Sequence, residues 1–305
     1  MMEPTFVGIE TTSYSGATLL SFLLNAHPRI ATIGEMDGLI LKNPEQYTCS
    51  CGQPIQQCEF WQAMTREMAA RGFDFDLHDF RNEFILGGPE FLQRLRAGSF
   101  GNRTLDSIRD LALRTLPGER RQFQQLVARN MAFVASALKI TGKTIFVDTS
   151  KDHLRARALK MLSPYDVRVI HLVRDPRGVT ASKLRRGSKL DARNTARQWV
   201  RLHTRLQKGL GAEMGSKYIR VRYEDLCREP RAVLKSLYAF CGADAEFEPS
   251  DFKSSPHHVV GNPMRLEKMS VIKLDERWRE LLTAEQQQVV WHVAGKLGAQ
   301  YGYTG

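Results

Sequence analysis

The sequence predicts an α/β fold, in which a central parallel sheet is flanked by helices and carries one helical insertion. Three observations support this expectation. Short apolar runs recur along the chain, polar residues follow each run, and a helical pattern comes next, as in βαβ units. The 305 residues, with 42% hydrophobic content, are enough for a full core. We expect a single domain over residues 1–305, with a helical insertion or cap at about residues 59–141.

Short apolar runs are the candidate strands. Four of them are 5–9, 144–147, 167–173 and 218–221, and a further short run precedes Glu35. Runs of this kind are typical of parallel strands that are buried on both faces. Ligands bind at the carboxyl edge of such a sheet, so the polar residues that follow each run are candidate site residues.

Helical patterns fill most of the remaining chain. A helix is expected to start near Ala17, and residues 59–141 read as helical throughout, with breaks at residues 87–88 and 117–118. Apolar residues recur at helical spacing in the basic stretch 192–213, which predicts an amphipathic helix laid on the sheet.

The net charge of +11 means that an acidic partner must be considered: nucleic acid, an anionic membrane or a polyanionic small molecule. The sequence has no zinc finger, aromatic RNA-binding motif or dense basic tail, so nucleic acid is not the expected partner. The N-terminal segment has an acid at position 3 and only a short apolar run, which predicts neither a signal peptide nor a membrane span. A cytoplasmic location is therefore expected.

The stretch IETTSYSGATLL (9–20) predicts an anion site, because a loop rich in Gly, Ser and Thr leads from a strand into the N-terminus of a helix. Ala17 and Thr18 stand where a Walker loop has lysine and a hydroxyl residue, so a magnesium-dependent nucleotide kinase fits poorly. The alternative is structural: Gly16 makes a tight turn, and Ser15 and Thr18 cap the helix.

A second candidate anion site is RDPRGVTAS (174–182). Pro176 suits the first turn of a helix, so Arg174 should lie at the carboxyl edge of the sheet and Ser182 about two turns along that helix. An arginine fork with a hydroxyl beside it suits a terminal phosphate.

Together these two segments resemble the paired motifs of the sulfotransferases that use 3′-phosphoadenosine 5′-phosphosulfate (PAPS). This family has a P-loop-like fold and includes the carbohydrate and tyrosylprotein sulfotransferases. Its early loop has Lys or Arg before Ser-Gly, where this chain reads YSGATLL, and its later R-D-P-R-x-x-x-x-S segment is matched completely. Further matches are CSCG (49–52), VDTSKD (147–152), RYEDLCREP (222–230) and GNPMR (261–265), so the resemblance spans nearly the whole chain.

The resemblance implies an enzyme that uses PAPS as co-substrate, releases 3′-phosphoadenosine 5′-phosphate and needs no metal. The early loop would hold the 5′-phosphosulfate, the arginine and serine of the later motif would hold the 3′-phosphate, and a late segment would close over the nucleotide. The residues implied in nucleotide binding are Ser13, Tyr14, Ser15, Gly16, Ala17, Thr18, Leu19, Arg174, Ser182, Arg265 and Lys268.

The resemblance also implies a glutamate base near the acceptor, and the corresponding residue is Glu35. The alternative is that Glu35 caps a helix that begins at Asp37. His27 is a competing base, although its place at a helix end favours a C-terminal cap. Lys151 is expected to reach the sulfuryl or bridging oxygen, and the alternative is an ordinary surface lysine.

Two positions need their own interpretation. Tyr14 stands where the family usually has lysine or arginine, so we expect its phenol to donate a neutral hydrogen bond while Lys151 or Arg265 supplies the charge. The alternative is a weak or lost transfer activity. Asp148 follows a strand as a Walker B aspartate does, but without a Walker lysine it is interpreted as a structural partner of Ser15 or of a loop amide.

Three of the five cysteines, Cys49, Cys51 and Cys58, form a cluster in the sequence. Three ligands with a C-x-C spacing and no obvious fourth make a poor structural zinc site. A packed loop, or one redox-dependent disulfide to Cys58, is expected instead, and no metal.

The expected acceptor is a hydroxyl, or an amine, of a small molecule, carbohydrate or peptide. Arginines in the stretch 59–141, among them Arg109, favour an anionic or sugar-like substrate, with ordinary solvated arginines as the alternative. Competing functions are a P-loop-like nucleotide kinase, from the order of strand, loop and helix, and a polyanion-binding module, from the net charge.

Overall fold

A parallel sheet lies at the centre of the protein. The computed structural model describes residues 3–37, 46–84, 88–97, 102–249, 251–252, 255–267 and 271–305. Within them, a five-stranded sheet has the order β2-β3-β1-β4-β5, and every neighbouring pair is parallel. The strands are β1 (Thr5–Glu10), β2 (Ile30–Gly34), β3 (Ile145–Asp148), β4 (Asp166–Val173) and β5 (Tyr218–Arg222). The predicted α/β fold with a parallel sheet is therefore confirmed, and each apolar run forms a strand.

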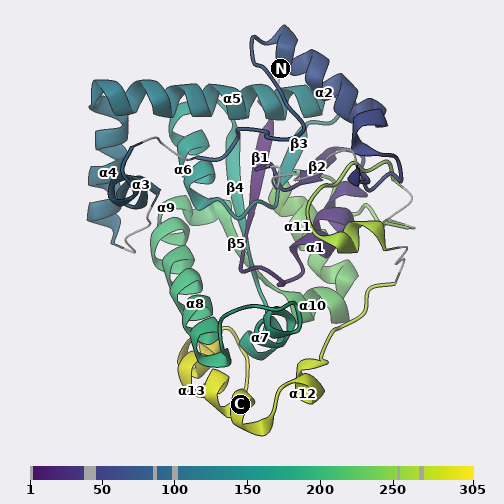
Figure 1. Cartoon of the computed structure of the whole chain (residues 1–305). Coiled ribbons are helices and arrows are strands. Elements are labelled where there is room, and N and C mark those ends of the chain that lie inside the picture. Colours follow the sequence, from purple (N-terminus) through teal and green to yellow (C-terminus); the bar gives the residue numbers. More distant parts are fainter. Residues whose placement is uncertain are drawn as a thin grey trace.

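Helices cover both faces of this sheet (Figure 1). They are α1 (Ala17–Asn25), α2 (Glu59–Ala70), α3 (Glu90–Ala97), α4 (Arg103–Thr115), α5 (Pro117–Thr141), α6 (His153–Leu162), α7 (Pro176–Arg185), α8 (Ala192–Arg205), α9 (Ala212–Met214), α10 (Tyr223–Arg228), α11 (Pro230–Cys241), α12 (Trp278–Leu281) and α13 (Ala284–Gln300).

The two faces of the sheet have separate cores because neighbouring side chains of a strand point to opposite faces. On β1, Phe6 packs with Phe146 and with Phe133 of α5, while Val7 packs with Leu20 of α1. All five side chains are fully buried. Helix α1 is thus fixed against one face, directly after the loop that follows β1.

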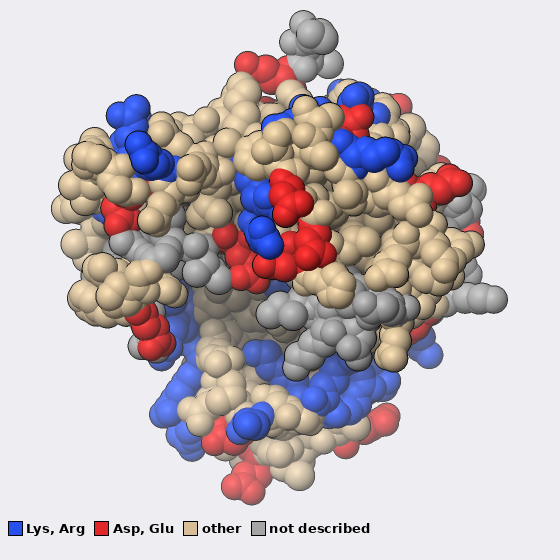
Figure 2. All heavy atoms as spheres, turned by 45° about the horizontal axis from the view of Figure 1, so that its top comes forward, with Lys and Arg blue, Asp and Glu red and all other residues tan. Residues whose placement is uncertain are grey.

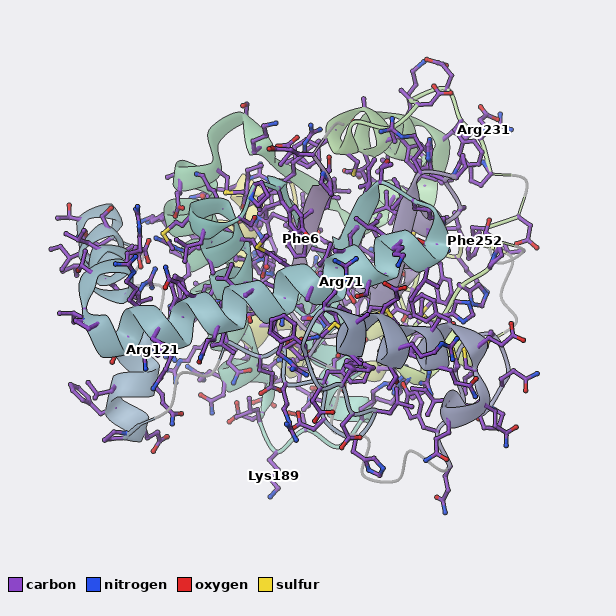
Figure 3. All side chains as sticks on the ribbon, turned by 90° about the horizontal axis from the view of Figure 1, so that it is seen from above. Phe6, Arg71, Arg121, Lys189, Arg231 and Phe252 are labelled. Carbon is purple, nitrogen blue, oxygen red and sulfur yellow. The ribbon has the colours of Figure 1, made fainter. Side chains whose placement is uncertain are left out.

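The stretch 59–141 differs from its expectation in two respects. It is not helical throughout, because residues 71–84 between α2 and α3 form turns and extended chain. Its last helix is more than a cap, since α5 begins at Pro117 and packs its second half on the sheet. Arg71, after the end of α2, lies beside α5 (Figure 3) and its Nε donates to Ser136 Oγ at 3.1 Å.

The amphipathic stretch 192–213 forms α8, a π-helical segment (Leu206–Gly211) and α9. Trp199 of α8 packs with Val290 of α13, whereas Leu206 and Leu210 join the core that includes Phe6. The prediction of an amphipathic helix laid on the sheet is confirmed, since α8 also packs against Val173 of β4. In the described part of the chain, no helix has the length and apolar character that crossing a membrane requires.

Candidate functional site

The candidate site lies at the carboxyl edge of the sheet. Because all strands are parallel, the residues that follow them meet at this edge. Glu35 follows β2, Lys151 lies in the turn after β3, Arg174 follows β4 and Tyr223 follows β5. The loop that leads into α1 follows β1, at the centre of the edge.

The loop after β1 leaves the first turn of α1 open. Gly16 is the N-cap with φ of 92°, and no side chain in the described part of the chain caps this end. Ser15 Oγ instead pairs with Thr12 Oγ1 at 2.7 Å, so the alternative in which Ser15 and Thr18 cap α1 is wrong. The first N–H groups of a helix have no acceptor within it, so those of α1 point toward the edge of the sheet.

A glycine is required at position 16. A Cβ there would lie 2.5 Å from Cδ2 of Tyr223, and a positive φ strains any other residue. Tyr223 therefore packs directly on the loop. Tyr14, two residues earlier, also has a positive φ of 65°.

Arg174 and Ser182 lie together beside this loop, as the sequence predicts. Arg174 Nη1 donates to the carbonyl oxygen of Tyr14 at 2.9 Å and lies 3.5 Å from Ser182 Oγ. Its Nη2 donates to the carbonyl oxygen of Asp275 at 2.9 Å and forms an ion pair with the same residue's carboxylate at 3.2 Å. Its guanidinium lies 4.6 Å from the ring centroid of Tyr223. The arginine joins the early loop, α7 and the chain near Asp275.

Glu35 and Lys151 form an ion pair at the other side of the loop. Lys151 Nζ lies 2.7 Å from Glu35 Oε1, and each side chain is 20% exposed. Lys151 is therefore no ordinary surface lysine, and its φ is positive, at 66°. Gly261 packs against the carboxylate, since a Cβ there would lie 3.3 Å from Glu35 Cδ.

Asp148 and Arg155 stabilise the loops at the same edge of the sheet. Asp148 Oδ1 accepts hydrogen bonds from the N–H groups of Met36 at 3.2 Å and Ser150 at 2.9 Å, and Oδ2 accepts one from Arg155 Nη1 at 2.7 Å. The structural role predicted for Asp148 is confirmed, with loop amides and an arginine as partners in place of Ser15. Arg155 is fully buried and also pairs with Asp37.

Two acids at this edge have raised pKa values. Burial raises the pKa of Asp37 to about 7 in spite of the Arg155 guanidinium, and the carboxylates of Asp148 and Asp152 add to the rise. Burial, followed by the same two carboxylates, also raises the pKa of Glu10. Sequence reasoning missed Glu10, although an acid as the last residue of a buried strand was a visible signal.

Arg265 interacts with backbone carbonyls. Its Nη1 donates to Gly261 O at 2.8 Å, its Nη2 donates to Thr48 O at 3.0 Å, and its guanidinium lies 4.0 Å from the ring centroid of Tyr47. In this arrangement it connects two loops, and a phosphate contact remains a prediction. Lys268 lies outside the described residues.

The remaining loop residues differ in exposure. Ser13 is exposed, whereas Ala17 and Leu19 are buried, so the latter two can offer a ligand only their N–H groups. His27 lies beyond the far end of α1, buried against Tyr238 and Phe247. Its Nδ1 accepts a hydrogen bond from the N–H of Arg29 at 3.0 Å, so it does not serve as a base at the carboxyl edge.

A cation beside the Tyr14 ring was not anticipated from the sequence. The guanidinium of Arg186, at the end of α7, lies 5.4 Å from the centroid of that ring. Lys151 and Arg265, which were expected to supply charge there, have the partners described above. The run of basic residues at the end of α7 was the sequence feature from which Arg186 could have been predicted.

Cys49, Cys51 and Cys58 also meet, together with a residue that sequence reasoning missed. His258 Nδ1 lies 3.2 Å from Cys58 Sγ and 3.8 Å from Cys49 Sγ. The cysteines are free thiols, with Cys51 Sγ and Cys49 Sγ at 3.7 Å and 3.9 Å from Cys58 Sγ. The spacing in the sequence gave no signal for His258, which is 200 positions away from Cys58.

Charged side chains are unevenly distributed on the face that Figure 2 shows. Figure 2 shows a recess across the middle of one face, with acidic side chains above it and lysine and arginine side chains gathered below it. A cavity of about 280 Å³ lies near Arg174 and is lined by Asp275, Arg177, Arg222 and Trp278 among others. Glu35 and Lys151 do not line that cavity.

Comparisons with known proteins identify the family of this chain. A sequence model of the sulfotransferase family matches residues 12–249, which is more than half of the chain. Carbohydrate sulfotransferase 5 of Mus musculus is 27% identical over 165 residues, which cover 45% of this chain and 42% of that protein. Carbohydrate sulfotransferase 3 of Homo sapiens is 27% identical over 189 residues, which cover 50% and 39%. The chain thus spans about two fifths of the length of these curated relatives.

A solved structure gives the same result for the fold. The sulfotransferase domain from the Synechococcus PCC 7002 olefin synthase aligns with 100% of this chain and 97% of its own, with a TM-score of 0.52 and 20% identity. At this identity the likeness concerns the fold.

Proposed function

Because the chain belongs to the sulfotransferase family, we propose that it transfers the sulfuryl group of PAPS to a hydroxyl or amine acceptor. The observation that carries the proposal is the meeting, at one sheet edge, of an open helix N-terminus, the Arg174–Ser182 pair and the Glu35–Lys151 pair. The first two suit a ligand with two separate anionic groups, and the third suits proton transfer.

The early loop fits the phosphosulfate end of such a ligand. The N–H groups at the start of α1 and the hydroxyl of Thr18 would bind its oxygens, because the helix dipole and unpaired N–H groups favour negative charge. Because position 16 is a glycine, the loop can lie close to Tyr223, and no side chain at position 16 blocks the ligand.

Arg174 and Ser182 would bind the 3′-phosphate. Gly178 leaves room for the arginine, since a Cβ there would lie 3.0 Å from Arg174 Nε. The carboxylate of Asp275 now neutralises the guanidinium, and a phosphate would compete with it for the same N–H groups. Discrimination against nucleotides without a 3′-phosphate then follows from this arginine.

Glu35 would act as the base. As the acceptor oxygen forms its bond to sulfur, the acceptor proton passes to the Glu35 carboxylate, and the bond between sulfur and the bridging oxygen breaks, leaving the electron pair on the 5′-phosphate. Lys151 holds Glu35 in place before the reaction and would then turn toward the sulfuryl oxygens. Charge that develops on those oxygens is then stabilised without a metal ion.

For the acceptor we propose a carbohydrate hydroxyl, because the curated relatives carry carbohydrate sulfotransferase in their names. The arginines of the stretch 59–141 add little support. Arg109, one of these arginines, is buried and paired with Asp106 at 3.2 Å and Asp110 at 2.7 Å.

A transfer assay tests the proposal. The protein is incubated with PAPS labelled in the sulfuryl group and with a panel of sugars, phenols and amines, and the formation of 3′-phosphoadenosine 5′-phosphate is measured. We expect acceptor-dependent release without added magnesium. Calorimetry that detects no binding of the nucleotide product, or turnover of ATP that requires magnesium, would contradict the proposal.

A further inference from the structure

The three cysteines and His258 form a compact group, which we call the Cys3His cluster. All four ligand atoms lie within 4.8 Å of one another. Cys49 and Cys58 are buried, and Cys51 is exposed. The cluster lies outside the nucleotide and acceptor machinery described above, and nothing in that machinery uses its thiols.

Four of the six distances among the ligand atoms are close to those of a tetrahedral zinc site, and the other two, both from Cys51 Sγ, are at most 4.8 Å. With Zn–S of about 2.3 Å and Zn–N of about 2.05 Å, tetrahedral angles place two sulfurs about 3.8 Å apart and a sulfur and a nitrogen about 3.6 Å apart. The sulfurs of Cys51 and Cys49 lie 3.7 Å and 3.9 Å from that of Cys58. The two distances from His258 Nδ1, 3.2 Å and 3.8 Å, lie on either side of the ideal value.

The backbone builds this cluster from two remote segments. A tight turn follows Cys49. The N–H of Cys49 donates to Gln53 O at 2.8 Å, and the carbonyl oxygen of Cys49 accepts from the N–H of Gly52 at 2.9 Å. Gly52 has a positive φ of 91°. Ser50 Oγ joins this turn to the second segment, because it accepts a hydrogen bond from the N–H of Val259 at 2.7 Å. The turn thus directs two thiols toward the histidine of the other segment.

His258 is held in position by packing. Its ring stacks on that of Phe60, with centroids 4.6 Å apart and an angle of 2° between the planes. Phe60 belongs to α2, which starts directly after Cys58. The ring that offers Nδ1 is therefore oriented by the same helix that carries one of the thiols.

We propose that the Cys3His cluster binds one Zn²⁺ ion as a structural site. Three thiolates and an imidazole are a soft donor set that favours zinc over calcium or magnesium, and four protein ligands leave no open position for catalysis. This replaces the expectation from the sequence that the cluster binds no metal, which rested on the missing fourth ligand.

The ion would connect the segment around residues 46–58 to the segment around residues 255–267. The second segment carries Gly261, which packs on Glu35 and whose N–H donates to Tyr47 Oη at 2.8 Å. Zinc would therefore fix the position of Gly261, on which the Glu35 carboxylate packs. The metal site itself does not depend on the proposed transferase function.

Metal analysis of the full chain tests the proposal. The protein is produced in zinc-supplemented medium, any affinity tag is cleaved off, and the metal content is measured by mass spectrometry after purification without chelators. We expect about one zinc per chain, and a roughly tenfold or greater loss of bound zinc in Cys51→Ser. Because Cys51 is exposed, this substitution leaves the buried core unchanged. Cys227→Ser, which changes a thiol outside the cluster, is the matched control and should retain the metal.

A second measurement reports on the ligands of the metal. Replacement of the metal by Co²⁺ should give a thiolate-to-cobalt charge-transfer absorption that is lost in Cys51→Ser and retained in Cys227→Ser. The proposal is overturned if protein with reduced thiols takes up no zinc from excess zinc salt. It is equally overturned if non-reducing peptide mapping of freshly isolated protein finds Cys58 in a disulfide.

Discussion

Lys151 Nζ lies 2.7 Å from Glu35 Oε1, so that one ion pair joins the chain after β3 to the chain after β2. These strands are neighbours in the sheet, although more than a hundred residues separate them. The pair is only 20% exposed on each side and lies where the resemblance places a base and a cation. Its two members are the first targets for substitution.

Glu35→Gln should lower kcat by roughly 10² to 10⁴ fold, because the variant cannot take up the acceptor proton. Lys151→Ala should lower kcat by about 10² fold through the loss of charge near the sulfuryl group. Binding of the nucleotide product, measured by calorimetry, should change little in Glu35→Gln.

The matched control is the ion pair between Lys139 and Glu67, which has the same distance of 2.7 Å but lies on helices α5 and α2. Glu67→Gln and Lys139→Ala should keep kcat within about twofold, because this pair lies outside the candidate site. Full activity of Lys151→Ala would remove the argument that this lysine compensates for the tyrosine at position 14.

Arg174→Ala should weaken binding of 3′-phosphoadenosine 5′-phosphate by roughly 10 to 150 fold, which corresponds to the loss of a charge-assisted contact of about 1.5 to 3 kcal/mol. The same variant should bind adenosine 5′-phosphate, which lacks the 3′-phosphate, as weakly as the unchanged protein does. Titration calorimetry with both nucleotides measures the difference. Arg185→Ala, an exposed arginine on the same helix, is the control. Equal losses for both nucleotides would contradict the role of Arg174.

Gly16→Ala should lower the free energy of unfolding by about 1 to 3 kcal/mol, because it places a side chain at a positive φ and against the Tyr223 ring. Gly118→Ala is the matched change, since a Cβ there meets nothing within 4 Å and the residue is helical. That variant should be neutral or up to about 1 kcal/mol more stable. Urea unfolding measures both, and equal effects would show that the loop tolerates a side chain.

The pH dependence of stability should report on Asp37. Its folded pKa of about 7 lies above the unfolded value of about 3.9, so the folded state binds the proton more tightly. Its contribution to stability is fully present below about pH 4 and is lost as the pH rises through about 7. Asp37→Asn removes this titration, so its stability relative to the unchanged protein should rise by about 1 to 4 kcal/mol between about pH 5 and pH 8.

Urea unfolding at both pH values gives this comparison. The informative quantity is the change in the stability difference of the two proteins from one pH to the other, because the lost contact to Arg155 lowers the stability of the variant at both pH values. A pH-independent difference between the two proteins would show that Asp37 is ionised in the folded state throughout this range.

Local patterns were enough to place the main elements. The strand around Phe6, the start of α1 near Ala17 and the start of α7 at Pro176 all depend on neighbouring residues: apolar runs, turn-forming glycine and the fixed φ of proline. The parallel sheet then brought Arg174 and Ser182 to the early loop, as predicted. The order of strands and helices along the chain determines which residues lie at the carboxyl edge of the sheet, and this order can be read from the sequence.

The sequence by itself thus determined the sheet, the open loop and the arginine-serine pair, because each depends on hydrophobic periodicity or on turn chemistry within a few residues. Only the tertiary structure decided that Lys151 pairs with Glu35, that Arg265 binds two carbonyls, and that His258 joins the cysteines. These partners are remote in the chain, and packing sets the direction of long side chains. No local spacing encodes such a contact, and the Cys3His cluster becomes visible only when both of its segments are folded together.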